Sequence, residues 1–349
     1  MAQDSMAFPG GPPVTIVVCA YNAEPYLARA LDSLLAQTYP RINILVIDDG
    51  STDATPRIIR EYARQNPGLT AICSPENRGT AAVRQQGLEQ APTELMLFFD
   101  ADDIALPDLV ARQVAMILAD EKCIAVGVYA YYIGADDETK RLALQAIGAT
   151  TREGFFDRYH GHKILYNTIY TLFRKSFALA AGGFRQTGFE EYPDLRLQDI
   201  SEDVDLWTRM ADFGRDGCYM LTIPEGLVLY RKMAGTLSAV NVRHMARKLR
   251  WIKDCVQRRR SGLAERRFFE FLAQRSCWQR FSDWRQELGG YAYKRMTLAV
   301  LGKRYLPAVL WGMAVVFLSP GLAIKKLQTQ RLWLGKVLRA KETAGGFNS

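Results

Sequence analysis

Short apolar segments alternate with longer amphipathic segments along the first 130 residues of the chain. The apolar segments predict buried strands over residues 14–20, 42–47, 69–73 and 94–99. Helices are predicted over 23–37, where apolar residues recur near a period of 3.6, and over 54–64 and 80–90. This alternation is typical of successive βα units, so we expect an α/β fold with a parallel sheet.

The pattern continues with a predicted helix over 109–119 and a predicted strand over 124–133, whereas residues 134–165 look irregular. A further strand is predicted over 166–173, and a helix over 202–213 whose cap is the Ser201 hydroxyl. Beyond residue 241 the chain becomes Arg-rich and helical in pattern. We therefore expect three parts: a flexible N-terminus over 1–12, an α/β domain over 13–240 and a basic helical tail over 241–349.

Charge is distributed unevenly between these parts. The chain has a net charge of +8, yet residues 241–349 hold 23 Lys and Arg against 6 Asp and Glu, which leaves a net −9 on residues 1–240. A basic tail on an acidic body attracts polyanions, and nucleic-acid phosphates and anionic lipid headgroups attract it alike. Composition alone does not distinguish a nucleic-acid partner from an anionic membrane.

One segment of the tail, residues 305–324, contains no charged residue and is flanked by basic pairs on both sides. As a continuous helix it would be about 30 Å long, which is enough to cross a bilayer. Pro307 and Pro320 interrupt it, and positive charge at both ends favours the same membrane face for both. We expect an in-plane or re-entrant membrane anchor rather than a span, with a buried core helix as the alternative.

Several classes of protein lose support at this point. The six cysteines show no C-x-x-C spacing and the histidines number only three, which argues against a structural zinc site and fits a reduced, cytosolic compartment. Residues 1–13 lack a basic region followed by an apolar run, so we expect no secretory signal. Without the P-loop, G-x-G-x-x-G and H-E-x-x-H motifs, kinase-like NTPases, dinucleotide dehydrogenases and zinc proteases are disfavoured.

Acidic residues crowd the end of the fourth predicted strand, at Asp100, Asp102 and Asp103. Two carboxylates about 4 Å apart repel each other by about 4 kcal/mol at an effective dielectric near 20, so a folded cluster needs a cation or raised pKa values. Oxygen ligands at this density favour Mg²⁺ or Mn²⁺. The alternative is a turn and helix cap before the helix that starts near Pro107.

Two further acidic pairs lie at similar positions. Asp48 and Asp49 end the second predicted strand, where Asp-Gly turn chemistry is the alternative explanation. Glu202 and Asp203 open a predicted helix, where acidic residues complement the helix dipole. The two strand-end clusters are expected at the carboxyl edge of the sheet, which is where open α/β sheets bind ligands.

Together these motifs resemble the family 2 glycosyltransferases of GT-A fold over about residues 13 to 240. The resemblance rests on seven short motifs in the family's order: Val14–Asn22, Asn43–Asp53, Glu76–Gly79, Phe98–Asp103, Gly182–Phe184, Ser201–Asp203 and Tyr230-Arg231. It implies a Rossmann-like, mostly parallel central sheet flanked by helices, here with a C-terminal helical, membrane-associating extension. The chain departs from many family members after Arg231, where it has Lys232 to Ser238 in place of a His and a G-S-x-S stretch.

The resemblance also implies roles for individual residues. Those assigned to the nucleotide-sugar are Tyr21, Asn22, Glu24, Asp48, Asp49, Arg78, Asp100, Ala101 and Arg231. A Mn²⁺ or Mg²⁺ ion would be held by Asp102, Asp100 and Asp103. Asp203 would be the general base that accepts the proton of the acceptor hydroxyl, with Glu202 as the alternative.

We therefore expect an inverting, metal-dependent glycosyltransferase that moves a sugar from a nucleotide-sugar, with a UDP-sugar favoured. The acceptor implied is membrane-associated, a lipid-linked or other glycan of polysaccharide biosynthesis, and the protein would attach peripherally or monotopically to the cytoplasmic face of an anionic membrane. One alternative is a nucleotidyltransferase, although Ala20–Ala23 is not the Gly-rich, Lys-bearing loop it needs. The other is a polyanion-binding protein that uses the tail, but we expect no nucleic-acid partner.

Overall fold

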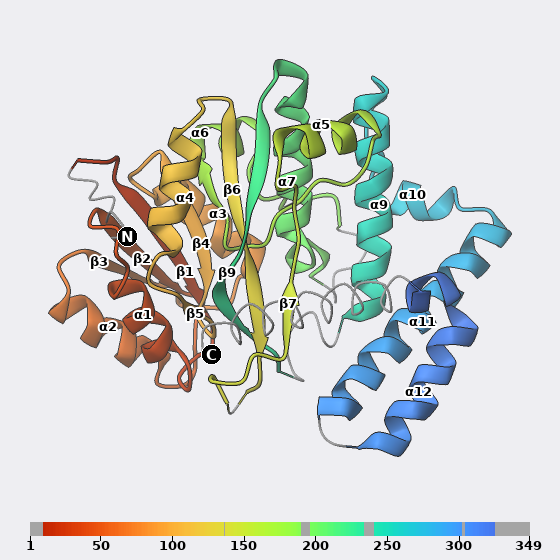
Figure 1. The fold of residues 1–349 in the computed structure, drawn as a ribbon, viewed down its shortest axis with the longest axis horizontal. Coiled ribbons are helices and arrows are strands. Elements are labelled where there is room, and N and C mark those ends of the chain that lie inside the picture. Colours follow the sequence, from red (N-terminus) through yellow and green to blue (C-terminus); the bar gives the residue numbers. More distant parts are fainter. Residues whose placement is uncertain (1–9, 136, 190–195, 234–240, 302–303, 325–349) are drawn as a thin grey trace, which may run out of the picture. The chain divides into compact units, whose positions relative to one another are not determined.

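The computed structural model describes residues 10–135, 137–189, 196–233, 241–301 and 304–324 (Figure 1). The chain divides into two compact units, which we call the first unit (1–232 and 252–267) and the second unit (233–251 and 268–349). Residues 252–267, which belong to the tail in the sequence analysis, thus group with the first unit. Parts of three sequence predictions lie outside the described residues: 1–9 of the N-terminus, 234–238 of the departing segment and 325–349 of the tail.

The described strands of the first unit form a single mixed sheet in the order β3-β2-β1-β4-β8-β6-β9-β5, with β7 paired to β6 (Figure 1). Their bounds are β1 Val14–Ala20, β2 Ile42–Asp48, β3 Leu69–Cys73, β4 Leu95–Asp100, β5 Ile104–Ala105, β6 Cys123–Ile133, β7 Ala143–Gln145, β8 Leu172–Arg174 and β9 Tyr219–Arg231. The block β3-β2-β1-β4 is parallel, as is the β6–β9 pair, whereas β8 is antiparallel to both β4 and β6. The expectation of parallel βα units therefore describes the N-terminal half of the sheet.

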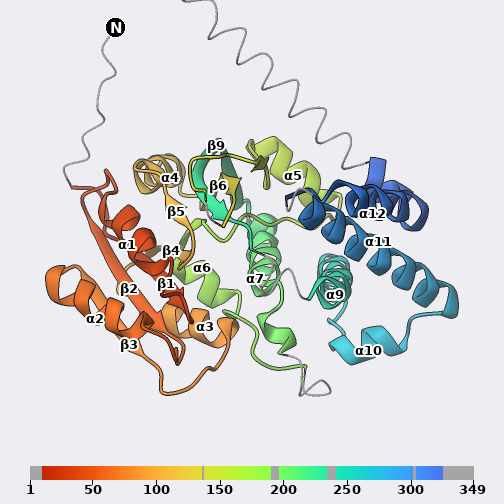
Figure 2. The ribbon, with the colours of Figure 1, turned by 90° about the horizontal axis from the view of Figure 1, so that it is seen from below.

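Helices cover both faces of this sheet, with α1 and α4 on one side and α3 and α7 on the other (Figure 2). The helices of the first unit are α1 Leu27–Leu35, α2 Thr55–Gln65, α3 Thr80–Gln90, α4 Leu109–Leu118, α5 Arg152–His160, α6 Lys175–Ala180, η1 Leu197–Asp199, α7 Glu202–Met210 and η2 Ala211–Asp216. Helix α3 lies tightly against the sheet at Gly87, where a Cβ atom would come within 2.5 Å of the Val17 side chain. This packing fixes α3 over the central strands.

Most of the predicted elements are present, and three predictions are wrong. Residues 134–165 are not uniformly irregular, because they contain β7 and α5. The strand predicted over 166–173 is reduced to β8, because side chains replace a ladder there: Asn167 donates to the Leu221 carbonyl and Thr168 to the Val128 carbonyl. Ser201 does not cap α7 through its hydroxyl, because its backbone is left-handed, with φ of 54°.

The second unit is helical, with α10 Phe268–Ala273, α11 Cys277–Leu301 and α12 Tyr305–Leu318; helix α9 Val242–Arg260 has residues in both units. Helices α11 and α12 pack as a hairpin, with the Tyr291 and Trp311 rings edge to face at 5.9 Å. Within the described ranges, no helix is both long enough and apolar enough to cross a membrane. Residues on one side of α12 are more than half exposed although apolar: Leu306, Val309, Leu310, Met313, Val316 and Phe317.

Candidate functional site

The carboxyl ends of β1, β2 and β4 lie side by side at one edge of the sheet. In the strand register Asp48 of β2 pairs with Ala20 of β1, and Asp100 of β4 pairs with Cys19 of the same strand. This edge is where open α/β sheets bind ligands. The structure thus brings two of the acidic motifs together around the end of β1.

The loops after β1 and β2 are tied to each other by side chains from the first loop. The Asn22 side-chain oxygen accepts a hydrogen bond from the Thr52 amide at 2.9 Å, and Glu24 accepts one from the Ala54 amide at 3.2 Å. Asn22 adopts a left-handed backbone, with φ of 47°, which its short polar side chain tolerates. Asn22 and Glu24 therefore connect the two loops while they remain exposed, as does the Tyr21 ring.

Carboxylates of the protein hold the backbone at the start of α3. Asp49 accepts hydrogen bonds from the Arg78 amide at 2.8 Å and from the Gly79 amide at 2.9 Å, and Asp199 accepts one from the Ala81 amide at 2.7 Å. Gly79 has a φ of 95°, and a Cβ there would collide with the Asp199 carboxylate. The turn before α3 is thus fixed between β2 and η1.

Asp48 and Arg78 differ in their exposure to solvent. The Asp48 carboxylate is buried and accepts a hydrogen bond from the Ser51 amide at 3.3 Å, while its other oxygen has no hydrogen-bond partner among the described residues. The Arg78 side chain is exposed and donates to Ser74 and Gln86. Of this pair, only the guanidinium of Arg78 is open to an anionic ligand.

The end of β4 presents two carboxylates, Asp100 and Asp102. Asp100 is ion-paired through one oxygen with Arg84 at 2.8 Å. Burial and then the charge of Asp100 raise the pKa of Asp102 to about 6. The side chain of Ala101 between them is buried, so any contact it makes with a ligand would involve its backbone.

The third aspartate of the cluster, which the resemblance assigns to the metal, is buried in the structure. Asp103 is fully buried, and its carboxylate accepts hydrogen bonds from the Tyr170 hydroxyl and, at 2.7 Å, from the Arg231 amide. Burial, followed by the charges of Asp102 and Asp100, raises its pKa well above the ordinary value. Asp103 thus anchors the turn to β9, and its two oxygens are already used within the protein.

Arg84 of α3 joins two motifs that are far apart in the sequence, and the sequence analysis missed it. Its guanidinium pairs with Asp100 through Nη2 and with Glu202 through Nη1, and the Arg84 and Glu202 side chains are only 8% and 7% exposed. The opposing charges raise the arginine pKa despite its burial, so the group is a permanent cation. The available signal was a charged residue on the apolar, sheet-facing side of a helix.

The two acidic residues at the start of α7 are not equivalent. Glu202, which the sequence predicts as the alternative base, is buried and pairs with Arg84 through one oxygen. Asp203 is half-buried, and its Oδ1 accepts a hydrogen bond from the Val204 amide at 2.8 Å. Of the two, Asp203 is the carboxylate with access to solvent.

Arg231, which the resemblance assigns to the donor, is bonded within the protein. Its guanidinium is buried and donates to the carbonyls of Asp102 at 2.9 Å and Ala135 at 2.7 Å, and it pairs with Glu138 at 2.7 Å. These bonds tie the Asp100–Asp103 turn to the end of β6. The sequence shows a Tyr-Arg pair here but not the direction of the arginine.

A divalent ion fits the two remaining carboxylates. In the described part of the chain, no group of three or more His, Cys, Asp or Glu residues is placed to hold a metal. Mg²⁺ and Mn²⁺ sites, however, commonly use one or two carboxylates together with substrate phosphates and water. Asp102 and the free oxygen of Asp100 match that donor set.

Residues 15–178, which include β1 to β4 and most of this edge, match the family model described as glycosyl transferase family 2. Over these residues the chain is similar to the family 2 glycosyltransferases. The glycosyltransferase GlyA of Streptococcus pneumoniae is 28% identical over 230 residues, which cover 65% of this chain and 32% of GlyA. The succinoglycan biosynthesis protein ExoO of Rhizobium meliloti is 36% identical over 115 residues, or 33% of this chain and 32% of ExoO. The matched regions thus span about a third of the length of each of these relatives.

Solved structures of glycosyltransferases show the same fold. The TarS 1-349 chain of S. aureus in complex with UDP-GlcNAc superposes with a TM-score of 0.52 at 15% identity, covering 87% of this chain and 91% of that chain. The mannosyltransferase PcManGT of Pyrobaculum calidifontis, in complex with GDP-Man and Mn²⁺, superposes with a TM-score of 0.54 at 19% identity, covering 95% of this chain and 87% of PcManGT. The expected GT-A architecture is confirmed at the level of the fold.

Proposed function

We propose that this protein is an inverting glycosyltransferase of polysaccharide biosynthesis that moves a sugar from a nucleotide-sugar to an acceptor hydroxyl. The observation that carries the proposal is the Asp100–Arg84–Glu202 bridge, which places the strand-end carboxylates beside the first turn of α7, where Asp203 is accessible. The similarity to family 2 and the relatives from polysaccharide biosynthesis support it.

In this proposal each carboxylate has one task. Asp203 accepts the proton of the acceptor hydroxyl as the oxygen attacks the anomeric carbon, and concerted transfer suits a carboxylate of ordinary basicity. A Mg²⁺ or Mn²⁺ ion held by Asp102 and Asp100 would offset the negative charge of the departing nucleoside diphosphate. Arg231 and Asp103 keep the turn that bears Asp102 in place through their bonds to β6 and β9.

The donor we propose is a UDP-sugar. TarS, one of the two structural neighbours above, has UDP-GlcNAc bound, whereas PcManGT has GDP-Man bound. GDP-sugars are therefore the donors against which UDP-sugars must be compared. The exposed Tyr21 ring and the Arg78 guanidinium are the groups of this edge that are open to a base and to an anionic part of the donor.

The test is a titration of the protein with UDP-, GDP-, CDP- and TDP-sugars, with and without Mn²⁺, followed by thermal shift and by release of nucleoside diphosphate. We expect stabilisation by UDP-sugars that requires the metal and is lost in Asp102→Ala. We also expect Asp203→Asn to lower turnover by about 100-fold or more while the donor still binds, since general-base catalysis contributes about 10²–10⁴-fold.

The matched control is Asp157→Asn, an exposed aspartate on α5 away from the strand ends, which should leave both readouts unchanged. Absence of stabilisation and of product across the whole panel, with folded protein and added lipid, would overturn the proposal. Full turnover in Asp203→Asn would refute the assignment of the base alone.

We further propose that the acceptor is lipid-linked and that the protein docks on the cytoplasmic face of an anionic membrane through α12. The apolar residues exposed on α12 recur at helical spacing from Leu306 to Phe317, and exposed Trp278 and Trp284 lie on α11. Apolar helix faces, tryptophans and basic residues are the features of in-plane membrane segments. The basic charge of residues 241–349 supports the choice of an anionic surface.

Flotation with vesicles of phosphatidylcholine containing phosphatidylglycerol tests this attachment. We expect Leu310→Glu to reduce flotation, because it puts a charge on the apolar face, whereas Leu179→Glu, at an exposed leucine of α6, should not. Retention on DNA in the same salt with no flotation would instead favour a nucleic-acid partner for the tail.

A further inference from the structure

Arg231 contacts three segments at the edge of the sheet where the strand-end carboxylates lie. Its Nε donates to the Asp102 carbonyl at 2.9 Å, and its Nη1 donates to the Ala135 carbonyl at 2.7 Å, in the segment after β6. Its guanidinium also packs over the ring of Tyr26, which precedes α1, at 4.7 Å from the ring centre. The Arg231 side chain is 2% exposed, so its positive charge is buried beside Asp102.

The carboxylate of Glu138 balances this buried charge. Its Oε1 pairs with Nη2 of Arg231 at 2.7 Å, and its Oε2 pairs with Nε of Arg29, on α1, at 3.1 Å. The Arg29 side chain is 60% exposed, so Arg29 is the outer partner of Glu138 and Arg231 is the inner one. One carboxylate thus links α1 to the end of β9.

The Asp102 carboxylate lies close to the Arg231 charge without being paired with it. Burial and then the charge of Asp100 raise the pKa of Asp102, and the charge of Arg231 partly offsets that rise. Within the described ranges, however, the guanidinium of Arg231 forms its ion pair with Glu138, and it takes the carbonyl of Asp102. The Asp102 carboxylate therefore stays available to a divalent ion.

Loss of the Glu138 charge would change this balance. A buried charge that loses its partner is strongly unfavourable, so it gains most from another group of opposite sign nearby. For Arg231 that group is Asp102, whose carbonyl it already holds. A guanidinium paired with Asp102 would compete with a metal ion for the carboxylate and would repel the ion.

We propose that Glu138 is a positioning residue for the metal of the transfer reaction: by neutralising Arg231, it leaves the Asp102 carboxylate free to bind the ion. Glu138 acts through Arg231 and does not itself touch the metal. The inference rests on the proposed function, because it takes Asp102 and Asp100 as the metal ligands.

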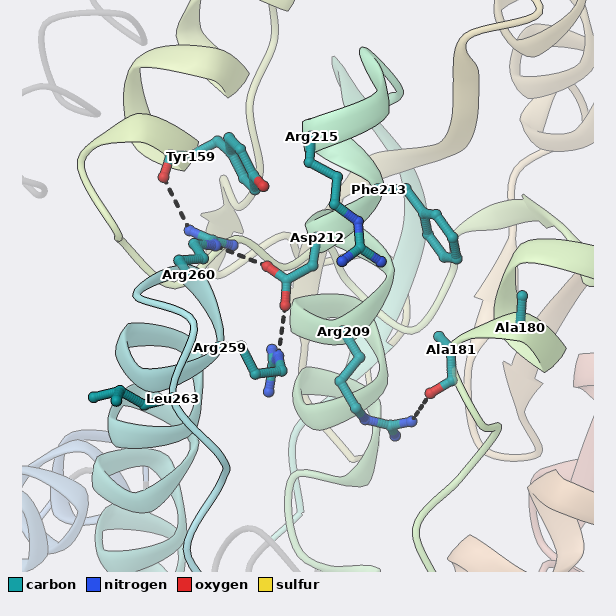
Figure 3. Close-up of a pocket in the computed structure, with 10 residues that line it drawn as sticks. All are labelled: Tyr159, Ala180, Ala181, Arg209, Asp212, Phe213, Arg215, Arg259, Arg260 and Leu263. Carbon is teal, nitrogen blue, oxygen red and sulfur yellow. Dashed lines mark hydrogen bonds and ion pairs between the residues drawn. The ribbon is translucent and has the colours of Figure 1, made fainter.

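A second carboxylate of the first unit is shared by two arginines and provides a matched control. Asp212 accepts a hydrogen bond from Arg260 at 2.7 Å and another from Arg259, and Figure 3 shows it between these two guanidinium groups. Asp212 lines a cavity of about 530 Å³. It follows the last turn of α7, roughly 14 Å along the helix axis from Asp203 in the first turn. Asp212→Asn therefore removes the same charge and the same kind of bridge at a distance from Asp203.

Calorimetric titration of the full chain with UDP, and separately with GDP, tests the inference when each titration is done with and without Mn²⁺. The measured quantity is the factor by which Mn²⁺ strengthens nucleotide binding, and it does not depend on turnover. Glu138→Gln keeps the size of the side chain and removes its charge. We expect the Mn²⁺ factor to fall about tenfold or more in this variant, since loss of an outer partner weakens metal sites by about 10–100-fold. Nucleotide binding without Mn²⁺ should not weaken, because the variant leaves more positive charge at this edge.

Two further variants separate neutralisation of Arg231 from other effects of the substitution. Arg29→Gln removes the outer ion pair of Glu138 and leaves the inner one, so the Mn²⁺ factor should stay within about twofold of the parent value, as expected for an exposed pair. Asp212→Asn should also leave the factor unchanged, even where it lowers the melting temperature.

The outcomes distinguish this inference from the proposed function. A parent value of the Mn²⁺ factor in Glu138→Gln overturns the inference, and so does an equal loss in Asp212→Asn or in Arg29→Gln. A factor that is present in the parent and abolished in Asp102→Ala supports the metal site itself, whatever Glu138→Gln shows. A parent protein whose nucleotide binding gains nothing from Mn²⁺ overturns the metal site and this inference with it.

Discussion

Replacement of Arg84 by methionine should destabilise the protein strongly. Arg84→Met keeps much of the side-chain volume but removes the cation between Glu202 and Asp100. The Glu202 arm is almost fully buried, and leaving a buried charge without its partner costs about 3–5 kcal/mol. The Asp100 carboxylate is 32% exposed, so solvent screens that arm and its loss adds at most about 1 kcal/mol.

Urea unfolding followed by circular dichroism measures the loss as a lower midpoint at an unchanged slope. A second substitution identifies its cause. In Arg84→Met/Glu202→Leu no buried charge is left unpaired on the Glu202 side, so we expect the double variant to recover about 2 kcal/mol relative to Arg84→Met.

The reasoning fails if Arg84→Met unfolds within about 1 kcal/mol of the parent, since the pair would then be solvated in solution. It also fails if the double variant is less stable than Arg84→Met. The cost of Glu202→Leu would then add to the cost of Arg84→Met, as expected of two residues that do not interact.

Three other substitutions test the first unit, two near the site and one at the opposite end of the sheet. Tyr170→Phe removes a donor to the buried Asp103 carboxylate and should cost about 1.5–3 kcal/mol in urea unfolding. Gly79→Ala forces a side chain at positive φ against the Asp199 carboxylate and should lower the melting temperature in thermal denaturation. The loss of folding free energy should exceed the cost of a left-handed backbone alone, which is about 1 kcal/mol. Asp120 has its pKa lowered chiefly by a tyrosine hydroxyl of β9, so it stabilises the fold above its unfolded pKa. Asp120→Asn should therefore be less stable than the parent at pH 6, and the difference should vanish as the pH falls below the lowered pKa, as denaturation at several pH values would show.

The regular part of the fold could be predicted from periodicity alone. The predicted strands 14–20 and 69–73 and the helix 80–90 match β1, β3 and α3 to the residue. The predicted strand over 166–173 failed because its polar side chains bond to neighbouring backbones, which no local pattern reveals.

The chemistry of the site was only partly predictable. Asp102 and Asp103 are adjacent in the sequence and identical in type, yet one lies at the edge of the site while the other is bonded to β9. Arg231 is likewise indistinguishable from a surface arginine until its tertiary contacts are known, and the only signal for Arg84 is its place on the sheet-facing side of α3. Which side of the backbone a charged group occupies is set by packing between distant segments.

The closed N-terminus of α3 has a consequence for how a diphosphate could be recognised. Folds that bind dinucleotides present the free amides at the start of a helix to the phosphates. Here the amides of Arg78, Gly79 and Ala81 already donate to Asp49 and Asp199, so the helix dipole is neutralised by internal anions. The charge of a bound diphosphate must therefore be neutralised by mobile cations and side chains. The affinity for the proposed donor then depends on ionic conditions rather than on a preformed set of backbone amides.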